Sequence, residues 1–413
     1  GLRPALGLTG VFLLVMAATS SADHAAKVHS VANEGFLIDN QPRIHVHPAG
    51  AGIVRSIGNL GIKGKLMLPS QLRPLLAVGL ILMCTPTFAQ TNEPSPSTWI
   101  DIEETALTLV EQEKFDEALA LVEQLAPKLQ DRGFEVSDLT LNILFEAGRT
   151  EEALTVWEKG LDEGYFYFVI PRSDTFDGVR RDERFRKLVA RNNRLREMAQ
   201  RESKPTYQVI KPASFSPDSS YPLVMIIHGG NQSIVKAMER WDPTAIGDDV
   251  IIAYVQSGWR ADTKGFRWNL GGVDIYSLPT AQDEVIGLYR EIVEKYPVDT
   301  SQVTLAGFSQ GGNLALVMAA EGTIPARGFI AGCPAIRTPL SLETARAAAA
   351  RGLRGTIFVG ADDWTAALAA TSVSNFEKAG NPVNLIVMED KGHEFPDNFD
   401  EMLRESVKQI YDR

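Results

Sequence analysis

One stretch of the sequence combines residues that could carry out nucleophilic catalysis. The pentapeptide 307–311 reads Gly-Phe-Ser-Gln-Gly; the short apolar run 303–306 precedes it, and a helix-like run, 312–320, follows. A serine between a strand and a helix, with glycines on both sides, is typical of a nucleophile elbow, where small residues permit a tight turn. The N–H groups that begin the helix would point toward the hydroxyl. Ser309 is therefore the candidate nucleophile.

A nucleophilic serine needs a general base, and histidine is the usual residue for this role. In sheets that carry such an elbow, the chain order is serine, acid, histidine, so the base must follow Ser309. Only His393, in the loop Lys391-Gly392-His393-Glu394-Phe395, meets this condition. We predict that His393 is the base and that His228 is a structural anchor of its loop. The remaining four histidines lie in the first 66 residues: His24, His29, His45 and His47.

An acid is needed to orient the imidazole. Asp362 and Asp363 follow the apolar run 356–359, at the end of a predicted strand, and either could bond His393. Asp390 is a weaker candidate because it lies three residues from His393 and leaves a different strand.

Backbone donors for an oxyanion hole are predicted at two strand ends. Gly229 and Gly230 follow the apolar run 222–227, and glycines there let N–H groups approach a substrate closely. With the N–H of Gln310 they form the predicted oxyanion hole. Three tryptophans in nearby loops are expected either to wall an acyl pocket or to pack in the core: Trp241, Trp259 and Trp268.

The elements that must position these residues alternate between strands and helices. Buried helices are predicted at 281–296 and about 398–411. Continuous apolar strands separated by helices indicate a mostly parallel sheet covered on both faces, with its site at the carboxyl ends of the strands. The fold class is thus α/β. Strands are expected at 206–210 (an edge strand), 222–227, 250–255, 303–306, 328–331, 356–359 and 383–388.

The chain before residue 100 reads as leader and export sequence. Residues 1–66 show no domain-like pattern, so we expect a doubtful leader that is not native, with Met67 as the natural start. Residues 67–89 combine Arg73, a short apolar run and Thr87-Phe88-Ala89, which is typical of a signal peptide. We therefore expect a periplasmic or secreted protein with no stable membrane span in the mature chain. The polar, Pro-rich segment 90–99 reads as a linker.

Residues 100–203 have a helical pattern with an internal repeat. Lys114-Phe115-Asp116-Glu117-Ala118-Leu119 recurs as Arg149-Thr150-Glu151-Glu152-Ala153-Leu154, 35 residues further on. This period resembles that of tetratricopeptide helix pairs. We interpret the region as a helical domain packed against the next domain; the alternative is a groove for a protein partner. The aromatic run 165–168 is expected in a helix–helix core or a domain interface.

Composition narrows the function classes. The chain has 413 residues and a formal net charge of −11, which argues against a protein whose main role is to hold nucleic acid. Its two cysteines, Cys84 and Cys333, show neither zinc spacing nor a disulfide framework.

Residues 204–413 resemble serine esterases of the α/β-hydrolase superfamily. Their GFSQGG, HGG, GADD and GH motifs look most like the phospholipase/carboxylesterase family, although Asn231-Gln232 replace the Gly and Asp often found there. Secreted polyester depolymerases and feruloyl esterases have a similar arrangement. The resemblance implies hydrolysis of carboxylic esters or thioesters through an acyl-enzyme, without metal or organic cofactor. Such relatives place the acid as Gly-x-x-Asp after the strand, which, counted from Gly360, selects Asp363.

Two other functions are compatible with these residues. A serine peptidase would use the same triad, but peptidase relatives usually add a propeller or a lid, which the helical prefix does not resemble. A non-catalytic hydrolase-fold module that binds a partner would be expected to lose a triad member, and none is lost. We therefore predict an exported serine esterase.

Overall fold

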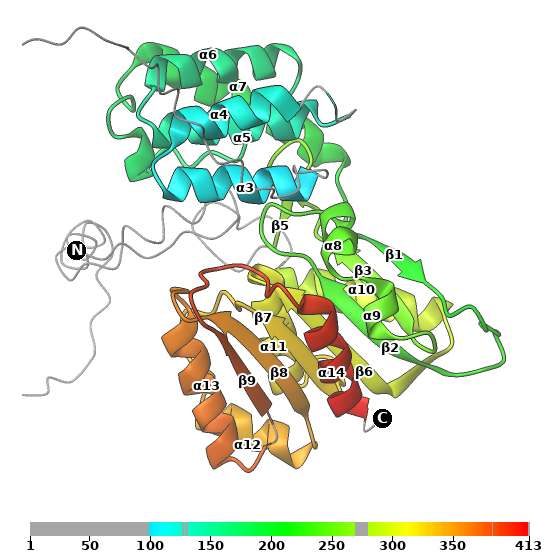
Figure 1. Cartoon of the computed structure of the whole chain (residues 1–413). Helices are drawn as coiled ribbons and strands as arrows, with labels where there is room; N and C mark the ends of the chain where they lie inside the picture. Colours follow the sequence, from blue (N-terminus) through cyan, green and yellow to red (C-terminus); the bar gives the residue numbers. More distant parts are fainter. Residues whose placement is uncertain (1–98, 126–127, 129–130, 269–279, 382, 412–413) are drawn as a thin grey trace, which may run out of the picture. The chain divides into compact units, whose positions relative to one another are not determined.

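The computed structural model describes residues 99–125, 128, 131–268, 280–381 and 383–411 (Figure 1). The predicted leader (1–66), the signal peptide (67–89) and nearly all of the linker (90–99) lie outside the described residues. Within the described ranges, no helix is both long enough and apolar enough to cross a membrane.

Residues 99–202, the helical region, form consecutive packed helices. Helix α3 packs on α4, and α5 packs on α6. The two copies of the sequence repeat fall at the starts of α4 and α6, so each marks the second helix of a pair. The likeness to tetratricopeptide repeats remains a prediction. The elements are α3 (Trp99–Glu111), α4 (Phe115–Leu125), α5 (Gly133–Glu146), α6 (Thr150–Asp162), the 3₁₀ turn η2 (Asp174–Phe176) and α7 (Glu183–Glu202).

The aromatic run after α6 serves both the helical core and the next region. In extended backbone, successive side chains point to opposite sides. Tyr165 and Tyr167 contact the ring of Phe134 in α5, with centroids 5.7 and 5.6 Å apart. Phe166 and Phe168 face the other way, where the guanidinium of Arg267 lies 4.2 Å from the Phe168 ring centre. The run is thus both a helical core and an interface.

Residues 206–411, the sheet region, are built on a seven-stranded sheet in the order β1-β3-β2-β6-β7-β8-β9. Strand β1 lies at one edge, antiparallel to β3, and the other neighbouring strands are parallel. This confirms the α/β fold class and the predicted edge strand. The strands are β1 (Thr206–Ile210), β2 (Tyr221–Ile227), β3 (Ile251–Gln256), β6 (Val298–Phe308), β7 (Gly328–Gly332), β8 (Arg354–Gly360) and β9 (Val383–Met388).

Helices cover both faces of the sheet, as continuous apolar strands require. One apolar cluster joins the sheet to α10 (Ala281–Lys295), α11 (Gln310–Glu321), α12 (Leu342–Ala350) and α13 (Ala366–Lys378). A second cluster joins the opposite face to α8 (Ile234–Arg240), α9 (Pro243–Ile246) and α14 (Phe399–Tyr411). A small hairpin, β4 (Trp259–Arg260) with β5 (Phe266–Arg267), stands apart from the main sheet.

Candidate active site

The parallel register brings the predicted site residues to one edge of the sheet. Ile227 of β2 pairs with Gly307 of β6, and Gly307 pairs with Ala331 of β7. The loops that follow these neighbouring strands therefore meet at the carboxyl edge, where α/β sheets bind ligands. The residues concerned follow β2, β6, β7, β8 and β9 respectively: His228, Ser309, Cys333, Asp363 and His393.

Ser309 has the strained backbone expected of a nucleophile elbow. Its φ is 54° and its ψ is −115°, between the end of β6 and the start of α11. Non-glycine residues rarely adopt such angles, and they persist only where the surroundings impose them. The Ser309 N–H donates to the carbonyl of Gly332, and the Ser309 carbonyl accepts from Ala335 and Asn313. Backbone bonds from the next strand end thus hold the turn.

The elbow also requires glycine at position 311. A Cβ there would lie 1.9 Å from the carbonyl oxygen of Ile227, a backbone atom that cannot move aside. The start of α11 therefore packs directly against the end of β2. This contact fixes Ser309 relative to the β2 loop that holds the predicted oxyanion glycines.

Asp363 and His393 form a buried pair. The Nδ1–H of His393 donates to Oδ2 of Asp363 over 2.8 Å, and both residues are buried. The other carboxylate oxygen, Oδ1, accepts from the N–H and the hydroxyl of Thr365 at 2.8 and 3.1 Å. With both oxygens engaged, the carboxylate is held rigidly. This geometry leaves Nε2 of His393 to accept a proton, as a triad base must.

Electrostatics keep Asp363 ionised. Burial alone would raise the pKa of Asp363, but bonds from His393, Thr365 and Cys333 outweigh it and lower the pKa below its usual value. For Cys333, burial and the nearby carboxylate raise the pKa of the thiol well above its usual range. Cys333 is therefore a protonated neighbour of the pair and not a thiolate nucleophile.

The structure separates the three aspartates considered from the sequence. Only Asp363 contacts His393, while Asp362 and Asp390 are exposed and their side chains make no hydrogen bond to another described residue. Asp390 has a φ of 56°, which fits a turn after β9. The catalytic role of Asp363 remains a prediction, but the geometry favours it over both alternatives.

Phe308, the residue before Ser309 in the chain, connects the elbow to the Asp363–His393 pair. The ring of Phe308 contacts that of His393, with centroids 5.1 Å apart at 61°. The indole of Trp364 stacks on His393 at 6.0 Å and 22°, so the imidazole is held between two aromatic rings. Among the described residues, the Ser309 hydroxyl makes no hydrogen bond. Catalytic bonds of this kind are often loose without substrate.

The predicted oxyanion donors differ in availability. The N–H of Gly229 donates to Oε1 of Gln232 over 2.9 Å, so a neighbouring side chain already occupies this donor. No described residue accepts from the N–H groups of Gly230 and Gln310, and a Cβ on Gly230 would touch the Gln310 side chain at 3.2 Å. Gly230 and Gln310 therefore remain as the adjacent pair of donors. The sequence signal for this difference between Gly229 and Gly230 was Gln232, a position at which the chain departs from the resembled family.

His228 has the structural place expected of it. Its Nδ1–H donates to the carbonyl of Gly229, and its Nε2 accepts from the N–H of Ser257. Burial lowers the pKa of His228 to about 4, so the ring stays neutral. Trp268 stacks on this ring at 4.9 Å. Both imidazole nitrogens are thus used to anchor the β2 loop.

Trp241 and Trp268 pack in the core, and Trp259 is only partly buried. Trp241 lies against Phe399 with ring centroids 4.9 Å apart, and Trp268 donates from its indole to the carbonyl of His228. None of Trp241, Trp259 and Trp268 is among the described residues that line the cavity reached by His393.

The cavity next to His393 has walls from both regions. Its volume is about 1330 Å³, and Phe308, His393 and Phe395 line it on the sheet side. Residues from α3 and α5 of the helical region line the opposite side, among them Glu111 and Phe134. The sequence did not point to these helices as part of the site, because nothing local links them to Ser309.

A metal centre is a second possible interpretation of the buried cluster. Ligand atoms of Cys333, Asp363 and His393 lie within 4.8 Å of one another. However, Asp363 and His393 bond each other directly at 2.8 Å, which leaves no space for an ion between these two atoms, and the thiol is protonated. The donor set therefore suits a triad better than a metal site.

Comparisons with known proteins yield distant structural likenesses. Neither a protein-family model nor a curated protein matches the chain. Among solved structures, an uncharacterized protein from Bacillus cereus ATCC 10987 is 21% identical, with 76% of this chain and 99% of that chain covered and a TM-score of 0.41. The carboxylesterase of Bacillus cereus is 17% identical over 52% of this chain and 99% of its own, with a TM-score of 0.39. The esterase PE8 is 15% identical over 50% and 99%, with a TM-score of 0.40.

Proposed function

We propose that the protein is a serine hydrolase that cleaves carboxylic esters or thioesters. The observation that carries this proposal is the buried Asp363–His393 bond of 2.8 Å beside the strained elbow of Ser309. A candidate nucleophile, base and orienting acid at the carboxyl ends of β6, β9 and β8 form the constellation needed for acyl transfer.

The proposed reaction follows from these positions. Ser309 Oγ attacks the ester carbonyl while Nε2 of His393 takes the serine proton, and Asp363 stabilises the resulting imidazolium. The N–H groups of Gly230 and Gln310 would hold the developing oxyanion, with the N-terminus of α11 adding a favourable partial charge. The same imidazolium protonates the leaving group. Water then cleaves the acyl-enzyme with His393 as base.

We assign the helical region to the catalytic unit and not to a partner-binding module. The cavity that contains His393 also has α3 and α5 as walls, which supports this assignment. Export through a signal peptide at 67–89 also remains part of the proposal; it falls on residues that the structure does not describe.

The test is hydrolysis of p-nitrophenyl esters of graded chain length by the purified protein, with Ser309→Ala as the control. We expect turnover by the unaltered protein and a loss of about 10⁶-fold in kcat for the variant. A peptide p-nitroanilide cleaved faster than every ester would favour the peptidase alternative. A folded protein without activity on either class would favour the non-catalytic module.

A further inference from the structure

The cavity beside His393 is large, its wall combines aromatic and charged side chains, and residues of both regions line it. A volume of about 1330 Å³ exceeds what a small ester needs. Aromatic rings line it from both sides. Among the described residues, these are Phe115, Phe134, Phe145 and Phe168 in the helical region and Phe266, Phe308 and Phe395 in the sheet region.

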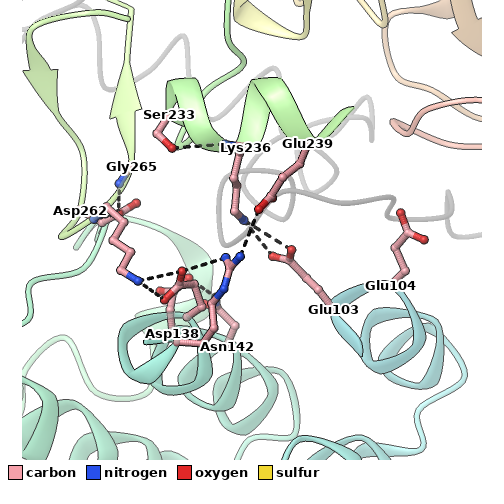
Figure 2. A network of polar contacts seen from close by, with 12 residues as sticks. Glu103, Glu104, Asp138, Asn142, Ser233, Lys236, Glu239, Asp262 and Gly265 are labelled. Carbon is pink, nitrogen blue, oxygen red and sulfur yellow. Dashed lines mark hydrogen bonds and ion pairs between the residues drawn. The ribbon is translucent and has the colours of Figure 1, made fainter. Parts of the chain in front are cut away.

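Ion pairs join the two regions around the cavity, and most of the cavity's basic side chains take part in them. Figure 2 shows Lys236 of α8 reaching Glu103 of α3, with Nζ 3.2 Å from Oε1. Arg260 of β4 instead lies over the ring of Phe266 at 4.7 Å. The other pairs across the interface are Arg132–Glu239, Arg240–Glu104 and Lys264–Glu135.

Several acidic side chains of the cavity have no such partner. Among the described residues, ten carboxyl groups line it against five Lys or Arg side chains. Burial raises the pKa of Asp138 to about 8, and the other nine carboxylates still outnumber the basic side chains. Among the described residues, Glu111, Asp138 and Glu146 form no ion pair. Asp138 has only a long contact, 3.5 Å, from the amide of Asn142 (Figure 2).

The surroundings of Glu111, which is exposed, and Glu146, which is half-buried, disfavour their charged forms. Burial, with a contribution from Glu394, raises the pKa of Glu111, and burial alone raises the pKa of Glu146. Glu111 and Glu394, the residue that directly follows His393 in the chain, both line this cavity. A positive group placed between them would relieve the repulsion of the two carboxylates.

We propose that the helical region selects substrates, and that the cavity accepts apolar esters carrying a positively charged ammonium group. This proposal rests on the serine hydrolase function proposed above. Carboxylates beside aromatic rings are the groups that bind alkylammonium ions, through charge attraction and cation–π contact. Anionic acyl groups are disfavoured by the same wall.

The test uses three p-nitrophenyl esters of equal chain length that end in trimethylammonium, tert-butyl or carboxylate. The first two are isosteric, so their ratio of kcat/KM reports charge alone. We expect the cation to exceed the neutral ester by about tenfold at low salt, with the anion last, and the preference to shrink as salt rises. p-Nitrophenyl acetate is assayed in parallel: its failure to react would overturn the proposed function itself, not the preference.

Substitutions locate the preference in the helical region. The double variant Glu111→Gln with Glu146→Gln should lower the cation-to-neutral ratio to near one. Glu197→Gln with Glu202→Gln, an equal charge change on the exposed end of α7, should leave that ratio unchanged. Inhibition by benzyltrimethylammonium gives an independent measure of the same site. A ratio near one in the unaltered protein, or one that both double variants lower equally, would overturn the proposal.

Discussion

The sheet region and the helical region hold their important side chains in different ways. Ser309, Asp363 and His393 are 7, 6 and 2% exposed, and backbone bonds or buried partners fix each of them. Glu111 and Glu146 of the helical region line the cavity without ion-pair partners among the described residues, and ion pairs and hydrogen bonds join this region to the sheet region. The difference teaches that the side chains proposed for chemistry and those proposed for selectivity are held by separate contacts. Helix side chains can change without disturbing the elbow.

The largest effect is expected for the acid proposed in the sheet region. Asp363→Asn should keep the fold but lower kcat by about 10³- to 10⁴-fold, because an amide cannot hold His393 in the tautomer that accepts the serine proton. Its matched control is Asp362→Asn, which should stay within about tenfold. Ester hydrolysis and circular dichroism measure the two properties. The reverse pattern would transfer the acid role to Asp362, and mild effects from both would point to Asp390.

These acid and base positions were predictable because their signals are local. The glycines around Ser309 and the sole downstream histidine, His393, are visible in the sequence itself. The residues alone left Asp362 and Asp363 open, and the Gly-x-x-Asp spacing of the resembled family, counted from Gly360, favoured Asp363. Thr365, which bonds the carboxylate, lies two residues further on and could also have been found from that spacing.

Other features depend on side chains that meet only in the folded chain. The capture of the Gly229 N–H by Gln232 cannot be read from a glycine motif. Helices α8, α9, α12 and α13 were not predicted individually from the sequence. Glu111 lies far from His393 in sequence, so its place in the same cavity follows from tertiary packing alone.

A second prediction concerns how tightly the elbow is built. Gly311→Ala places a methyl group 1.9 Å from the Ile227 carbonyl oxygen, so the backbone must shift. We expect a loss of at least about 3 kcal/mol in the free energy of unfolding, or failure to fold. Gly287→Ala in α10 is the control: nothing lies within 4 Å of the added atom. It should stabilise by about 0.5–1 kcal/mol in urea denaturation. Equal effects would refute the tight contact.

A smaller effect is expected from Asp138 in the helical region. Burial, with a contribution from Asp262, raises the pKa of Asp138 from 3.8 to about 8. The folded state therefore keeps a proton that the unfolded state loses, and this contribution to stability fades as pH rises from about 4 to 8.

Asp138→Asn should remove this part of the pH dependence. Between pH 6 and pH 8, the variant should lose less stability than the unaltered protein, by about 1 kcal/mol, a size set by the partial solvent contact of the side chain. Urea denaturation at both pH values measures it, with the exposed Asp116→Asn as control. An unchanged slope in the Asp138 variant would show that this carboxyl is not protonated in the folded protein.

The central claim is that Ser309 is an activated nucleophile. A fluorophosphonate probe reacts only with such a serine, and mass spectrometry of the labelled peptide identifies the residue. We expect labelling at Ser309 that disappears in Ser309→Ala and in protein unfolded before exposure. Labelling that persists in Ser309→Ala, or none in a folded sample, would contradict it.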